Sequence, residues 1–321
     1  MMADDNGPWY DGLIEEFDRV HRGRAIDNRK NVVAMRMRGH AANDFPYDMR
    51  YEPYIARLGM LPFVLQFKRK PPPVNHAVLT ALTDRWRPET HSFHLPCGEM
   101  AMTLEDMAMI SGLPLNGDAV TGHVIAVNWR QRVGVLIGVE PPPPLPDEPD
   151  ASKVKHSWLK ELDQTSMRTR ESSSLCGFVW SLIMWERLSV GRPMLKNPDN
   201  PNPNPHEGLH DEDPYSRPTV AYHWDQVSIY TGNSHVRYKC YMNELDTLTA
   251  EQVFRRSYEE DRGYDLNQMC TRDNNMWRSR CPMICFCAVE FHFVDRVARI
   301  FGKRQGIPTE ETRSVITSLH G

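Results

Sequence analysis

The chain has 321 residues, of which 40% are hydrophobic and 25% are charged. These proportions are typical of globular proteins and allow a sizeable core. The formal net charge of −4 excludes a global basic field of the kind that attracts nucleic acid. The seven cysteines show no disulfide-rich spacing. We see no signal-peptide pattern, and no run approaches the roughly 18 apolar residues of a membrane span. We therefore expect a reducing compartment, the cytosol or the nucleus.

Residues 1–50 form a mixed, polar arm with a basic centre. Seven arginines and lysines lie between Arg19 and Arg38, against Asp27 alone, a local excess of +6. One interpretation is an arm that binds phosphate groups or serves nuclear import. The other is a solvated tail, which we favour because charge runs usually form solvated surfaces.

Proline-rich runs divide the remainder of the chain. The run at 71–73 follows three basic residues and indicates a joint. The run at 141–146 indicates an extended polyproline linker. The predicted parts after the arm are residues 51–140, a linker with a shortened segment at 141–175, residues 176–308 and a tail at 309–321.

A helix is predicted to begin at Asn75, whose side chain is a good N-cap. Leu79, Leu82 and Trp86 then recur at helical spacing and form one apolar stripe. Pro88 forbids the helix from continuing.

A tight β-hairpin and a second helix follow. Short strands are expected at 92–95 and 100–102, with Gly98 supplying the positive φ of the turn. Thr103 and Asp106 have the spacing of a capping box. Gly112 and Pro114 would end the helix that this box begins.

Weaker patterns occur in four further segments. Residues 120–139 fit either two short strands or one helix, and periodicity does not decide between them. Residues 176–188 are strongly apolar and predict a buried helix. Alternation predicts short strands at 224–241, and a helical pattern covers 245–258.

The last strong pattern predicts an amphipathic helix over 283–301. Its apolar residues recur at spacings of three and four, and they are Phe286, Val289, Phe293, Val297 and Ile300. Polar residues, among them His292 and Asp295, fall on the opposite face. Glu290 lies inside the apolar arc, so we expect an arginine to meet its carboxylate.

Several groups resemble metal or catalytic sites, and each has a plainer explanation. His206, Glu207 and His210 match the zinc-protease pattern, but prolines and a glycine leave no packed helix to hold them. His91 and His94 would point to opposite faces of a strand, which argues against their joining Cys97 on a metal. The remaining candidates are a cysteine group and an acid-base group, which we interpret as structural: Cys281, Cys285 and Cys287 with His292, and Glu290 with His292 and Asp295. We expect no catalytic residue, metal or cofactor.

The stretch from Trp86 to Met100, followed by Thr103–Asp106 and Gly112–Pro114, resembles the signature of the plant mobile domain. This is the "aminotransferase-like" domain of MAIN-like (maintenance of meristems) proteins and of many plant transposons. Two later stretches also resemble it, 185–193 and 289–308. The residues that carry the resemblance are Trp86, Arg87, Pro88, Glu89, Thr90, His91, Phe93, His94, Leu95, Gly98, Glu99, Trp185, Glu186, Arg187, Glu290, His292, Arg296, Gly302 and Gln305.

The resemblance implies a mainly α fold with a small β-hairpin and a few short strands. It also implies a non-catalytic nuclear interaction or scaffold protein, linked to meristem maintenance, transposon silencing and genome stability. Protein partners are expected, one of them phosphatase-like. Two alternatives stay open: a metal-binding protein or enzyme that uses the His and Cys groups, and nucleic-acid binding through the basic arm.

The chain departs from the family pattern in its middle. Only about fifteen residues, 160–174, stand where family members have several helices. We therefore expect a missing central helical layer, which would leave Phe178, Leu182 and Trp185 uncovered.

Overall fold

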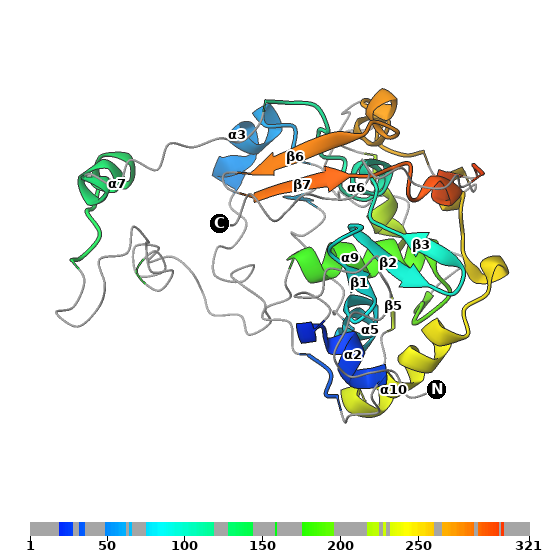
Figure 1. Ribbon diagram of the computed structural model, residues 1–321. Coiled ribbons are helices and arrows are strands. Elements are labelled where there is room, and N and C mark those ends of the chain that lie inside the picture. Colours follow the sequence, from blue (N-terminus) through cyan, green and yellow to red (C-terminus); the bar gives the residue numbers. More distant parts are fainter. Residues whose placement is uncertain are drawn as a thin grey trace.

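The α5–hairpin–α6 block forms the centre of the computed structural model and follows from local sequence signals (Figure 1). Helix α5 (His76–Thr83) begins where the Asn75 side chain accepts a hydrogen bond from the Val78 amide. Helix α6 (Leu104–Ser111) has the predicted capping box, and its C-cap Gly112 has a φ of +65°. The described residues are 19–27, 32–35, 49–61, 64–65, 75–118, 128–143, 158, 175–195, 217–224, 227–228, 232–259, 265–285, 288–301 and 303–304.

The hairpin between these helices is part of a three-stranded antiparallel sheet. Its strands are β1 (Trp86–Arg87), β2 (Ser92–Leu95) and β3 (Gly98–Met100), in that order. Phe93 lies opposite both Trp86 and Met100, and Gly98 has a φ of +122°. The β2–β3 hairpin was thus predicted correctly, but Trp86 belongs to strand β1 and not to the helix in which it was expected. Helix α5 ends at Thr83, five residues before the proline that was expected to stop it.

Two long helices complete the core. Helix α9 (Leu175–Arg187) confirms the predicted buried helix, and α10 (Ser234–Asp246) packs against α5. A single apolar cluster joins side chains from α5, the sheet, α6, α9 and α10. Leu182 and Trp185 have no exposed surface. The expectation that they would lie uncovered was wrong, because Trp224 packs on Trp185 with ring centroids 5.5 Å apart. The side chain of Phe178 lies outside the described residues.

The remaining elements are short. They are α2 (Arg22–Asp27), η1 (Met49–Tyr51), α3 (Glu52–Arg57), α7 (Trp129–Ile137), β4 (Met194–Leu195), η2 (Val220–Trp224), β5 (Val227–Ser228), η3 (Ala250–Gln252), η4 (Ser257–Glu259), η5 (Gln268–Cys270), η6 (Asn274–Met276), β6 (Cys281–Cys285), β7 (Ala288–His292) and η7 (Ala298–Phe301). Strands β4 and β5 pair with each other, as do β6 and β7. The fold is mainly α, as expected. No described helix is long and apolar enough to cross a membrane.

The predicted helix over 283–301 was wrong. Strands β6 (Cys281–Cys285) and β7 (Ala288–His292) pair antiparallel in this stretch, with Cys281 opposite His292, and η7 follows. Short apolar runs fit both periods, so their spacing alone does not separate a strand from a helix. Cys281 therefore lies on a strand, contrary to the expected helix cysteines. The side chains of Cys285 and Glu290 lie outside the described residues, as does Cys287, so the expected arginine partner of Glu290 stays a prediction.

The segment from 224 to 258 also differs from its prediction. Helix α10 replaces most of the expected strands, and η3 and η4 replace most of the expected helix at 245–258. Tyr238, Tyr241 and Leu245 are buried at spacings of three and four. The Asn233 side chain accepts from the His235 and Val236 amides and starts α10. Helix α7 answers the open question for 129–137, while 119–127 lie outside the described residues.

Replacement of the α10 cap tests this corrected assignment. Asn233→Ala should lower the free energy of unfolding by about 1 kcal/mol, because two amides lose their acceptor. Asn243→Ala, on the exposed surface of the same helix, should change stability by less than about 0.5 kcal/mol. Denaturant unfolding measures both values. Equal effects of the two substitutions would contradict a helix start at this asparagine.

Candidate functional site

Two of the most buried charges of the described chain, Arg187 and Asp106, form an ion pair. The Arg187 side chain, at the end of α9, is 2% exposed. Its Nε donates to Asp106 Oδ1 at 2.8 Å, and its Nη2 donates to Glu105 Oε2 at 2.9 Å. Its Nη1 donates to the Arg255 carbonyl at 2.7 Å. One guanidinium thus joins α9, α6 and the segment after η3.

Asp106 completes this arrangement because it belongs to the capping box of α6. Its Oδ2 accepts from the Thr103 amide and hydroxyl, while Oδ1 accepts from Tyr258 at 2.7 Å. The Arg187 guanidinium also lies 4.6 Å from the Tyr258 ring centroid. A carboxylate with no exposed surface therefore has a partner for each oxygen, which offsets its loss of water.

The electrostatics of this cluster favour permanent charge on Arg187. Burial by itself lowers the pKa of Arg187, but Asp106, Tyr258 and Glu105 outweigh burial and raise it. Burial, followed by the charge of Asp106, raises the pKa of Tyr258 well above its ordinary value. Neither group is therefore set up for proton transfer near neutral pH. The cluster acts as a structural ion pair.

A second ion pair joins the hairpin to the C-terminal segment. Arg296 donates through Nε and Nη2 to the two oxygens of Glu99 at 2.8 and 2.6 Å. Ser92, on the neighbouring strand, donates to Glu99 Oε2 at 2.8 Å. This paired geometry fixes both distance and orientation between segments about 200 residues apart.

The other signature residues of the hairpin build its interior. The rings of Trp86 and Phe93 meet edge-on, with their centroids 4.9 Å apart. His91, whose φ is +49°, packs on Phe293. His94 and Thr90 share a hydrogen bond of 3.0 Å. The rest of the hairpin set is buried or half-buried: Arg87, Pro88, Glu89, Leu95 and Gly98. His91 therefore lies in a turn and not on the strand assumed for it.

Two further signature residues also have internal partners. Glu186, fully buried, accepts from Trp224 Nε1 at 2.6 Å. His292 Nδ1 lies 2.8 Å from the Ser279 carbonyl, and its Nε2 accepts from the Leu104 amide at 3.4 Å. His292 is thus buried at the start of α6, contrary to the polar helix face predicted for it. Gly302 and Gln305 lie outside the described residues.

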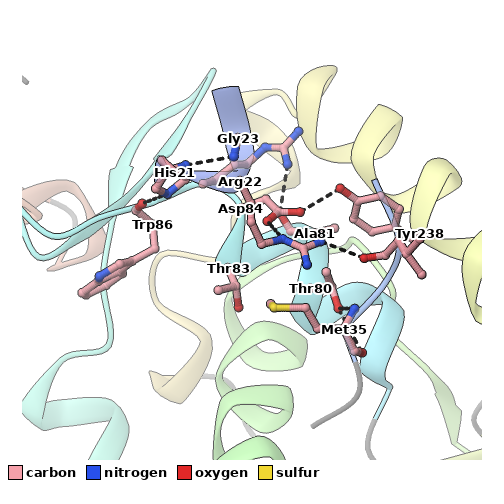
Figure 2. Close-up of polar contacts among 12 residues, drawn as sticks. His21, Arg22, Gly23, Met35, Thr80, Ala81, Thr83, Asp84, Trp86 and Tyr238 are labelled. Atoms are coloured by element: carbon pink, nitrogen blue, oxygen red, sulfur yellow. Dashed lines mark hydrogen bonds and ion pairs between the residues drawn. The ribbon is translucent and has the colours of Figure 1, made fainter. Parts of the chain in front are cut away.

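Part of the basic arm is also structural (Figure 2). Arg22 Nε donates to Asp84 Oδ1 at 2.8 Å, and Tyr238 donates to the other oxygen at 2.7 Å. His21 Nε2 lies 2.8 Å from the Trp86 carbonyl, and the Met35 amide donates to Thr80 Oγ1. The solvated tail we favoured is wrong for this portion. Neither Asp84 nor Tyr238 stood out in the sequence, because a buried acid paired across 62 residues leaves no local signal.

The suggested metal and catalytic groups do not assemble among the described residues. No group of three or more His, Cys, Asp or Glu side chains in the described part of the chain lies close enough to hold a metal ion. Burial raises the pKa of the Cys97 and Cys281 thiols, which disfavours the reactive thiolate. His206, Glu207 and His210 lie outside the described residues.

Comparison with known proteins identifies the family. The plant mobile domain model matches residues 65–172 and 161–319, so the chain belongs to the plant mobile domain family. Its MAIN-like relatives support the same assignment. Protein MAIN-LIKE 1 of Arabidopsis thaliana is 26% identical over 313 residues, which cover 76% of this chain and 57% of the relative.

Two other Arabidopsis thaliana proteins are similar to the chain. A serine/threonine-protein phosphatase 7 long form homolog is 30% identical over 312 residues, covering 73% of this chain and 22% of the relative. Protein MAINTENANCE OF MERISTEMS is 37% identical over 89 residues, which cover 27% of this chain and 18% of the relative. The chain therefore spans well under two thirds of each of these relatives. No solved structure matches it.

Removal of the buried guanidinium should strongly destabilise the fold. Arg187→Met should lower the free energy of unfolding by about 3–5 kcal/mol, because the Asp106 carboxylate is left buried without an opposite charge. Arg256→Met breaks a pair whose side chains are 64% and 68% exposed, and should cost less than about 1 kcal/mol. Denaturant unfolding compares the two variants. A similar small effect of both would exclude Arg187 as the central structural charge.

Stability should fall as the pH drops below about 6.5, the ordinary pKa of histidine. Burial lowers the pKa of His292, and also those of His94 and His21. The unfolded chain therefore binds protons first, which lowers the free energy of unfolding in this window. His292→Gln should reduce the slope between about pH 6.5 and 5 in urea unfolding at several pH values. An unchanged slope would contradict the role of His292.

Proposed function

We propose that this chain is a non-catalytic interaction protein that acts in the nucleus. The observation that carries the proposal is the use of the signature side chains. Arg187, Glu99 and Arg296 bind other parts of the same chain. Glu186 does so through Trp224. Residues used in this way build a rigid surface and are not available for chemistry on a substrate.

The biological setting of the proposal comes from the family. We propose roles in meristem maintenance, transposon silencing and genome stability, together with a phosphatase-like partner. The names of the relatives MAINTENANCE OF MERISTEMS and serine/threonine-protein phosphatase 7 long form homolog support this setting. Because the chain spans only part of each relative, the activities of those whole proteins belong to the proposal alone.

Two parts of the proposal concern segments outside the described residues. The family model matches two stretches of the chain, and these overlap at residues 161–172, inside the shortened segment. This supports the proposal that a central helical layer is missing there. Arg29, Lys30, Arg36 and Arg38 lie outside the described residues, and they are the part of the arm that we propose for nuclear import.

The proposal predicts nuclear accumulation of the full chain in plant cells. A fluorescent fusion should enter nuclei, and proximity labelling should mark chromatin or phosphatase-type proteins. A variant with Arg29, Lys30, Arg36 and Arg38 changed to Gln leaves Arg22 and Asp84 unaltered in the sequence and should reduce import. Exclusion of the wild-type fusion from nuclei, with neither partner class labelled, would refute the proposal.

Metal analysis of the purified chain addresses the competing enzyme or metalloprotein. Stoichiometric zinc that is lost after His206→Ala or Cys281→Ala would favour that alternative over a non-catalytic protein.

A further inference from the structure

The turn between β2 and β3 lies among arginines from two distant segments. Arg299, on η7, donates to the Cys97 carbonyl at 3.2 Å. Arg255 and Arg299 both act on the Cys97 thiol, where their charges oppose the rise in its pKa caused by burial. Figure 1 shows the β2–β3 turn between η7 and the 250–259 segment.

A third arginine extends this surface. The Arg278 guanidinium lies 5.8 Å from the Phe301 ring centroid, next to η7. Its charge also reaches Glu105, which opposes the rise in the pKa of that carboxyl caused by burial. We name Arg255, Arg278 and Arg299 the tip arginines. Arg278 and Arg299 are exposed, and Arg255 is half-buried.

Three carboxylates of the surrounding segments are already paired with other arginines. A fourth, Glu251, has its pKa lowered by a hydrogen bond with Thr249 and, to a smaller extent, by the charge of the nearby Arg255. Glu99 pairs with Arg296, and Glu105 pairs with Arg187. Glu259, on η4, pairs with Arg256. Among the described residues, no carboxylate lies within ion-pair distance of a tip arginine. The surface therefore keeps a local positive excess on a chain whose net charge is −4.

The tip arginines extend from backbone that is held in place. The Arg255 carbonyl accepts from Arg187, and the adjacent Phe254 amide donates to the Arg187 carbonyl at 2.8 Å. Ile300, next to Arg299, is 2% exposed. A Cβ on Gly98 would lie 3.0 Å from Arg299 Nη1, so this guanidinium packs directly on the turn. Anchored backbone reduces the entropy that binding must overcome.

We propose that the tip arginines bind a short acidic or phosphorylated peptide segment of a protein partner. Guanidinium groups match the planar geometry of carboxylate and phosphate better than lysines do. Arg255 and Arg299 both act at one hairpin turn, which suits a short peptide segment, whereas nucleic acid usually binds along an extended basic surface. The proposal rests on the interaction function proposed above and specifies the chemistry of the partner.

Fluorescence anisotropy with the full chain tests this binding. The probes are a labelled peptide with two phosphoserines among glutamates, the same peptide with glutamate at both phosphoserine positions, and a peptide with serine and glutamine throughout. The first two should bind and the third should not. Tighter binding of the first identifies phosphate as the preferred group, and equal binding identifies carboxylate; both outcomes agree with the proposal.

Two charge-matched variants locate the site. Arg278→Gln with Arg299→Gln should weaken peptide binding about tenfold or more, because two charge-assisted hydrogen bonds are lost. Arg57→Gln with Arg132→Gln removes the same charge from exposed positions on α3 and α7, and should weaken binding less than about twofold. Thermal unfolding should stay close to that of the wild type for both, since all four side chains are exposed and the Arg299 hydrogen bond lies at the surface.

Three outcomes would overturn the proposal. They are no binding of either acidic peptide, equal losses in the two double variants, and binding of single-stranded or duplex DNA in place of the peptides. The labelling experiment separates this failure from that of the interaction function. If the Arg278→Gln, Arg299→Gln variant still labels the wild-type partners in nuclei, the interaction function stands and the tip arginines are not its binding site.

Discussion

The fold depends on keeping the Asp106 carboxylate paired inside the protein. An isolated carboxylate in an apolar interior costs several kcal/mol, so Arg187 must reach it whenever the chain is folded. That requirement brings the end of α9 to the start of α6. Tyr258 and the Arg255 carbonyl complete the shell and fix the following segment. One charge pair thereby sets the relative positions of three parts of the chain.

The same device recurs at the edges of the core. Glu99 and Arg296 join the hairpin to the C-terminal segment, and Arg22 and Asp84 join the arm to α5. Each pair connects residues more than 60 positions apart and carries directional hydrogen bonds. Apolar burial favours compaction without choosing orientation, whereas paired charges choose it. The signature residues of this family therefore include side chains that join segments far apart in the sequence.

Internal use of these charges shapes the outer surface of the protein. Carboxylates that bind structural arginines no longer neutralise the arginines beside them. The tip arginines around the β2–β3 turn therefore keep a local excess of positive charge, although the chain as a whole is acidic. The structural network and the proposed recognition surface are therefore linked through the same few acidic side chains.

The sequence by itself determined the local features. Asn75, the Thr103–Asp106 box and Gly112 act through contacts within a few residues, and the helix at α9 follows from its continuous apolar composition. Family membership was also readable from the hairpin signature. Only the tertiary structure decided whether 283–301 and 224–246 were strands or helices, because their apolar spacing fits both periods and long-range pairing selects one. It also decided the partners of Asp84, Glu99 and Arg187, since ion pairs between distant segments leave no periodic trace in the sequence.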